Sequence, residues 1–196
     1  MTAIQKPGWS LSKIPHIFYA LRVFGPFLFF CRPSVCGPRI FNFMKSFKQN
    51  EGKDLPIGTA GFCWGGKFVT QFCWDGEENR LQDGKRITDC GFVAHPSFLK
   101  YPDDISKVQL PYSCAASEYD PQMSPEQAKQ TESILKEKTA TGQATGLEHE
   151  FVFYPGATHG FAVRADEDDK EEAERGKQAE AQALRWFSRW FANPPA

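Results

Sequence analysis

The first 50 residues of this 196-residue chain contain no acidic residue, although they contain seven Lys and Arg. Residues 51–196 hold 16 basic and 24 acidic residues, so the net charge of the whole chain is −1. This balance argues against general electrostatic binding to nucleic acid. The chain also has no apolar run near the roughly 18 residues of a membrane span, since Gly25 and Pro26 interrupt the longest one.

The sequence has no C-x-x-C pair, which argues against a zinc ribbon or a thioredoxin-like site. The spacing of its cysteines suits a reducing compartment better than a disulfide framework. We expect no secretory signal, because no basic and then apolar stretch opens the sequence. We therefore expect a cytoplasmic protein without a metal site. The six cysteines are Cys31, Cys36, Cys63, Cys73, Cys90 and Cys114.

Residues 1–50 form a Phe-rich basic segment with eight of the 18 Phe and five of the 14 Pro. A mitochondrial transit peptide is basic and poor in acids, but it is also Ser-rich and helical, and the prolines oppose that. A segment lying on a membrane surface is a second interpretation, because aromatic and basic residues favour that interface. We expect the third, a set of short helices whose Phe side chains pack on a core domain formed by residues 51–196.

From residue 51 onwards, short apolar runs alternate with helical patterns. Helices are predicted to begin near Gly65, after the Ser124-Pro125 cap, and near Asp169. Strands alternating with helices predict an α/β fold with a mostly parallel sheet and helices on both faces. The predicted strands cover residues 55–60, 90–94, 108–115, where Pro111 suggests a bulge, and 150–154, which the tight loop 155–160 follows.

Cys63 lies in the motif Gly61-Phe62-Cys63-Trp64-Gly65, between a predicted strand and a predicted helix. This pattern is typical of a nucleophile elbow with Cys in the usual Ser place. The sharp turn strains the nucleophile backbone and should leave no room for a side chain at Gly61 or Gly65. The start of the helix should lower the thiol pKa and aim the Trp64 N–H at an oxyanion. The alternative is a buried structural cysteine in a Gly-rich turn.

Two polar residues follow later strands. Asp120 comes just past the third predicted strand and could orient a histidine; Glu118 is the competing acid, and a turn role for Asp120 is the alternative. His159 lies in the Gly-punctuated loop after the fourth strand. His95 also follows a strand, but we expect it to be buried with its hydrogen bonds satisfied. The α/β-hydrolases have the same chain order of nucleophile, acid and histidine, each after a successive strand.

Three segments, GFCWGGKF, EYDPQMSPEQ and YPGATHGF, resemble the dienelactone hydrolase family, especially its fungal branch. The resemblance runs from about residue 55 to the C-terminus, and residues 1–50 resemble the region before the nucleophile strand. It implies a compact α/β-hydrolase fold that opens ester or lactone bonds with a triad of Cys63, Asp120 and His159. It also suggests Arg164 as an anion-binding residue, no metal or organic cofactor, and a place in secondary metabolism or catabolism.

The chain departs from this family in one respect, because the nucleophile strand is its first credible strand. In relatives the upstream strands supply a neighbour for that strand, a second oxyanion N–H and a glutamate that communicates with the cysteine. We therefore expect a fold shortened on its N-terminal side, a nucleophile strand at or near a sheet edge, and self-association.

Three functions remain open from the sequence. The leading one is a cysteine hydrolase of small-molecule esters or lactones. The alternative is a catalytically impaired or inactive remnant that serves as a binding partner or has no function. A weaker third is a redox-sensing thiol protein, because an activated Cys63 would oxidise readily.

Overall fold

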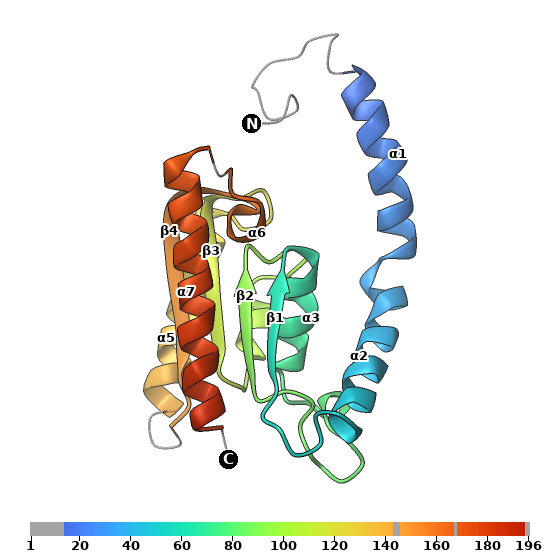
Figure 1. The fold of residues 1–196 in the computed structure, drawn as a ribbon, viewed down its shortest axis with the longest axis vertical. Coiled ribbons are helices and arrows are strands. Elements are labelled where there is room, and N and C mark those ends of the chain that lie inside the picture. Colours follow the sequence, from blue (N-terminus) through green and yellow to red (C-terminus); the bar gives the residue numbers. More distant parts are fainter. Residues whose placement is uncertain (1–13, 143–145, 167, 195–196) are drawn as a thin grey trace. The chain divides into compact units, whose positions relative to one another are not determined.

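The computed structural model describes residues 14–142, 146–166 and 168–194 (Figure 1). The chain forms two compact units, Met1–Phe43 and Met44–Ala196. The first contains helix α1 (Ile14–Phe30) and most of helix α2 (Pro33–Gln49), whose end belongs to the second unit. The described part of the Phe-rich segment is thus helical despite Pro26 and Pro38 inside the two helices. Its packing on the core and a domain boundary at residue 50 stay predictions, and residues 1–13 lie outside the described ranges.

The second unit is built on one parallel sheet of four strands in the order β1-β2-β3-β4. Because all strands run the same way, their carboxyl ends meet at one edge of the sheet. Within the described residues β1 has a strand neighbour on one side only, as the sequence predicted. The strands are β1 (Gly58–Phe62), β2 (Cys90–Ala94), β3 (Tyr112–Tyr119) and β4 (His149–Thr158).

Three of the predicted strands differ from the observed ones. β1 covers Gly58–Phe62 instead of residues 55–60. β3 begins after Pro111, so the expected bulge there is wrong, and the pairing of β3 with β4 instead shifts register between Ser117 and Tyr119. β4 runs through Pro155 and Gly156 to Thr158, so the predicted tight loop is largely strand. β4 is an edge strand of the described sheet. An edge strand tolerates proline where the missing N–H would face away from the neighbouring strand and so breaks no hydrogen bond of the sheet.

Helices cover both faces of the sheet, as expected (Figure 1). α3 (Trp64–Phe72) and α5 (Pro125–Gly142) pack on the face that includes Val93 and Cys114. α7 (Lys170–Ala192) packs on the face that includes Phe92 and Ala115. The alternation of side chains along each strand sends neighbouring residues to opposite cores. The shorter helices of the unit are the 3₁₀ helix η2 (Glu77–Asn79), α4 (Asp103–Ser106) and α6 (Phe161–Arg164).

Side-chain caps fix the starts of the two long helices. Ser124 Oγ accepts from the Gln127 N–H at 3.3 Å, while Gln127 Oε1 accepts from the Ser124 N–H at 2.8 Å. This reciprocal box confirms the helix start predicted there, and such a cap typically contributes about 1 kcal/mol. Asp169 caps α7 by accepting from the N–H groups of Glu171 and Glu172. None of the described helices is both long and apolar enough to cross a membrane.

Candidate active site

Cys63 occupies a strained turn between β1 and α3. Its φ of 50° and ψ of −120° lie outside the regions that residues with a Cβ prefer. Three backbone hydrogen bonds hold this conformation: the Cys63 N–H donates to Ala94 O, and Cys63 O accepts from the N–H groups of Gly66 and Ser97. Strain of this kind costs roughly 1–3 kcal/mol and persists only where the surroundings impose it. The backbone therefore makes the sharp, strained turn that the sequence predicted at this position.

The glycines around Cys63 are crowded at two positions. A Cβ on Gly61 would lie 2.7 Å from both Gly65 O and Val69 Cγ2, as the sequence predicted. The same prediction for Gly65 is wrong, because no heavy atom lies within 4 Å of its Cβ position. The second crowded residue is Gly66, where a Cβ would lie 2.7 Å from Pro96 Cβ. In the first turn of α3, the position without room for a side chain is therefore Gly66, against the loop after β2, and not Gly65.

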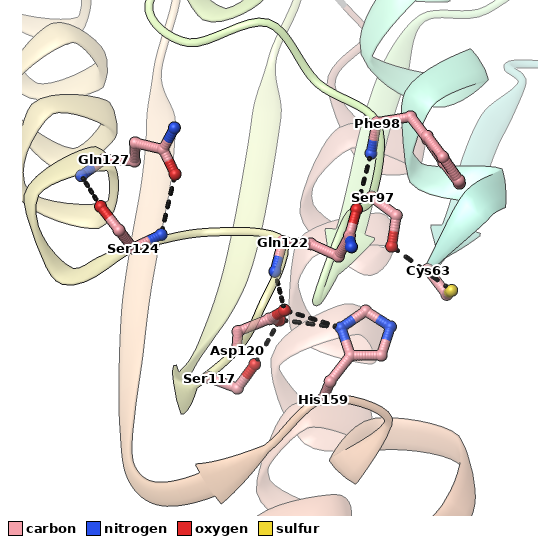
Figure 2. Close-up of polar contacts among 9 residues, drawn as sticks. All are labelled: Cys63, Ser97, Phe98, Ser117, Asp120, Gln122, Ser124, Gln127 and His159. Carbon is pink, nitrogen blue, oxygen red and sulfur yellow. Dashed lines mark hydrogen bonds and ion pairs between the residues drawn. The ribbon is translucent and has the colours of Figure 1, made fainter. Parts of the chain in front are cut away.

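Asp120 and His159 meet at the carboxyl edge of the sheet, directly after β3 and near the end of β4 (Figure 2). His159 Nδ1 lies 2.9 Å from both carboxylate oxygens of Asp120. The Ser117 hydroxyl donates to Asp120 Oδ2 at 2.8 Å, and the Gln122 N–H donates to Oδ1 at 2.8 Å. The carboxyl is 1% exposed and the imidazole 17% exposed. The acid is thus desolvated but fully hydrogen-bonded, which fixes its orientation.

Glu118, the competing acid, has a different partner. Its Oε2 accepts from the Gly156 N–H at 2.7 Å and so ties the end of β3 to β4. Gly156 has a φ of 74°, a conformation that glycine adopts readily. The structure therefore brings Asp120, and not Glu118, to His159.

The site is electrostatically coupled. Partial burial alone would raise the pKa of Cys63, but hydrogen bonds with Ser97 and His159, the charge of His159 and the Trp64 backbone lower it overall. Burial would lower the pKa of His159, but the bond to Asp120 and the interaction with Cys63 raise it. Burial likewise opposes ionisation of Asp120, yet His159, Gln122 and Ser117 together lower its pKa. Relative to the isolated groups, each of the three is therefore shifted toward its charged form.

Ser97 is a member of the site that sequence reasoning missed. Its Oγ lies 3.4 Å from Cys63 Sγ (Figure 2). The signal was available, since Ser97 follows the predicted strand 90–94 and so falls at the same sheet edge as Asp120 and His159. Gln122 was missed too; besides bonding Asp120, its Oε1 accepts from the Phe98 N–H at 3.4 Å. These contacts link the loop after β2 to the loop after β3.

His95 departs from the expectation of a satisfied histidine. It is 1% exposed, yet neither ring nitrogen has a hydrogen-bond partner among the described residues. Its ring centroid lies 4.9 Å from that of His159. Burial, and next to it the charge of His159, lower the pKa of His95 to about 4. His95 is therefore neutral near pH 7 and adds no charge beside the Asp120–His159 pair.

The other two predicted site residues flank the centre. Trp64 begins α3, and its indole packs against the ring of Phe68 with centroids 4.7 Å apart. Arg164 ends α6 and is exposed. Its guanidinium lies over the turn after His159. Arg164 Nη2 is 2.7 Å from the position that a Cβ on Gly160 would occupy. Across the described ranges, no three His, Cys, Asp or Glu side chains group closely enough to hold a metal ion.

This fold defines a protein of the α/β-hydrolase type. The structure has a TM-score of 0.54 against the acylaminoacyl peptidase of Pyrococcus horikoshii, at 15% identity, over 79% of this chain and 27% of that one. The sequence profile of the dienelactone hydrolase family matches residues 38–191. The chain belongs to the dienelactone hydrolase family.

Two fungal relatives each match 135 residues of the chain. The hydrolase pyvD of Aspergillus violaceofuscus is 30% identical over 135 residues, which is 69% of this chain and 48% of that protein. The hydrolase tropI of Talaromyces stipitatus is also 30% identical over 135 residues, covering 69% of this chain and 46% of the relative. The chain thus spans about half the length of the curated relatives it matches.

Proposed function

We propose that this chain carries the chemistry of an ester or lactone hydrolase, with Cys63 as nucleophile, His159 as base and Asp120 as the residue that orients it. The observation that carries the proposal is the Asp120–His159 pair, 2.9 Å apart, at the sheet edge that also holds the strained Cys63. Membership of the dienelactone hydrolase family supports the same reaction class.

The proposed reaction has two halves. The Cys63 thiol gives its proton to His159, and the thiolate attacks the carbonyl carbon while the Trp64 N–H donates to the developing oxyanion. The tetrahedral intermediate collapses to a thioester as His159 gives the proton to the leaving oxygen. His159 then takes a proton from water, whose oxygen attacks the thioester, and Cys63 leaves with that proton. Atoms balance: one ester and one water become one acid and one alcohol.

The substrate class is a small ester or lactone, with Arg164 as the candidate partner for a substrate anion. Arg164 suits this role because it is exposed and lies over the turn that follows His159. Guanidinium groups recognise carboxylates through paired hydrogen bonds.

Hydrolysis of p-nitrophenyl acetate tests the proposal. We expect Cys63→Ala and His159→Ala to abolish turnover, and Cys36→Ser, at a partly exposed cysteine, to leave it unchanged. Turnover that survives Cys63→Ala would assign the activity to another group and overturn the proposal.

An impaired hydrolase is the second candidate, and the position of β1 favours it. β1 has one strand neighbour in the described chain, whereas buried parallel sheets normally pair their inner strands on both sides. If a second oxyanion donor is missing, the rate falls on the order of 10²–10³. An ester-mimicking electrophile distinguishes the two functions: an impaired enzyme would react once at Cys63 without turning over the ester.

A further inference from the structure

The turn His95-Pro96-Ser97-Phe98 is built so that Ser97 lies beside the nucleophile. Two non-glycine residues of this turn, His95 and Phe98, have φ angles of 39° and 62°. Such conformations are costly for residues with a Cβ, so the loop is bent against its own preference. The bend places the Ser97 N–H 2.9 Å from Cys63 O and its hydroxyl 3.4 Å from Cys63 Sγ.

Among the described residues, the hydroxyl of Ser97 has one neighbour to which it can donate. It is buried, and the contact with Cys63 Sγ is its one hydrogen bond among the residues that the structure describes. A buried hydroxyl without a partner is costly, so the proton has a reason to face the sulfur. An anion accepts a hydrogen bond more strongly than a neutral thiol does, and such a donor therefore favours the thiolate.

Gln122 bridges this turn and the acid. The Phe98 N–H donates to Gln122 Oε1 at 3.4 Å, and the Gln122 N–H donates to Asp120 Oδ1 at 2.8 Å. Figure 2 shows the bridge between the loop of Ser97 and the Asp120–His159 pair. The turn is thus held on two sides: the Ser97 N–H donates to Cys63 O, and the Phe98 N–H donates to the Gln122 side chain.

We propose that Ser97 is a positioning residue, which holds the Cys63 sulfur and stabilises its thiolate by donating a hydrogen bond from its hydroxyl. The proposal rests on the function proposed above, with Cys63 as nucleophile. The hydroxyl keeps its own proton throughout; the proton of the thiol goes to His159, and the sulfur keeps the electron pair. Ser97 acts on the nucleophile alone.

The pH dependence of Cys63 alkylation by iodoacetamide measures this role without any ester. Peptide mass spectrometry gives the rate at each cysteine in the wild type, Ser97→Ala, Ser97→Thr and Ser124→Ala. The midpoint of the curve of alkylation rate against pH reports the formation of the Cys63 thiolate. We expect Ser97→Ala to move this midpoint to higher pH and to slow the alkylation of Cys63 at pH 7 about tenfold, which is the effect of losing one hydrogen bond to a charged group. Ser97→Thr keeps a hydroxyl and should keep the low midpoint. Ser124→Ala removes a hydroxyl from the cap of α5 and should leave Cys63 unchanged.

Each outcome has a separate meaning. A wild-type Cys63 that reacts no faster than Cys36 would defeat the proposed function itself. A fast wild-type Cys63 whose midpoint does not move in Ser97→Ala would overturn the role of Ser97 and leave the proposed function standing. The buried cysteines report the fold, since Cys73 and Cys114 become reactive if it is lost. In that case Ser97→Gly replaces Ser97→Ala, and loss of the fold in both would assign Ser97 to the fold and overturn the proposal.

Discussion

Asp120 holds His159 by one ring nitrogen, with both carboxylate oxygens 2.9 Å from Nδ1. A carboxylate can only accept a hydrogen bond, so Nδ1 carries the proton and donates a hydrogen bond to Asp120. Nε2 is then the basic nitrogen, on the opposite side of the imidazole. The charge of His159 lowers the pKa of Cys63, and Cys63 in turn raises the pKa of His159. The pairing therefore sets the tautomer that the proposed reaction requires.

Removing the charge of Asp120 tests this relationship. We expect Asp120→Asn to lower kcat for an ester roughly 10²- to 10⁴-fold, because the wrong tautomer and an unsupported imidazolium remove general acid–base catalysis. Glu118→Gln is the matched control and should change kcat little, since Glu118 bonds the Gly156 backbone. Circular dichroism of both variants checks the fold. The reverse result would move the orienting role to Glu118.

The pH profile of an unactivated alkyl ester, whose leaving oxygen needs a proton, should be bell-shaped. The thiolate forms as pH rises through the pKa of Cys63, which lies below its ordinary 9.0. The imidazolium is lost as pH rises through the pKa of His159, which lies above its ordinary 6.5. Asp120→Asn removes the main support of the imidazolium, so the alkaline limb of kcat/KM should move to lower pH. An alkaline limb that does not move would contradict the assignment.

Brief alkylation near pH 7 should single out Cys63. Burial raises the pKa of Cys73 well above its ordinary value and that of Cys114 to about 12, so both stay protonated and inaccessible. Site-resolved mass spectrometry after iodoacetamide treatment gives the order of reaction. Labelling of Cys73 or Cys114 as fast as that of Cys63 would end the argument for an activated nucleophile.

The buried ion pair of Lys67 and Asp104 should matter for stability. Lys67 Nζ lies 3.1 Å from Asp104 Oδ2, with side chains 11% and 5% exposed. Lys67→Met leaves a buried carboxylate without its cation, and we expect it to lower the free energy of unfolding by roughly 3–5 kcal/mol. Lys136→Met is the control, because it breaks an exposed pair with Glu132 that contributes about 1 kcal/mol at most. Urea unfolding of both variants measures the difference, and equal values would refute the prediction.

The outer side of β1 should promote self-association. An unpaired strand edge is a template for another chain, and charge on the edge blocks such pairing. We expect concentration-dependent association in sedimentation velocity, reduced by Ala60→Lys in β1 and not by Ala192→Lys at the end of α7. A chain that stays monomeric over the whole concentration range would contradict this prediction.

The sequence alone determined the layered fold and the place of the candidate site. β2 matches its predicted range of residues 90–94 because a strand buried on both faces has a continuous apolar signature. Cys63, Asp120 and His159 could be found because a parallel sheet gathers residues that follow its strands at one edge. Local patterns sufficed for these features, since each depends on a single strand and the turn after it.

Tertiary structure alone decided which neighbours meet at that edge. Glu118 and Asp120 carry the same chemistry two residues apart, so strand alternation places them on one face and cannot separate them. The register shift at the end of β3 separates them, and it depends on pairing with β4. The contact of Ser97 with Cys63 and the unsatisfied ring of His95 likewise depend on how the loop after β2 bends against α3. Contacts between distant segments leave no periodic trace in the sequence, and only the packed fold specifies them.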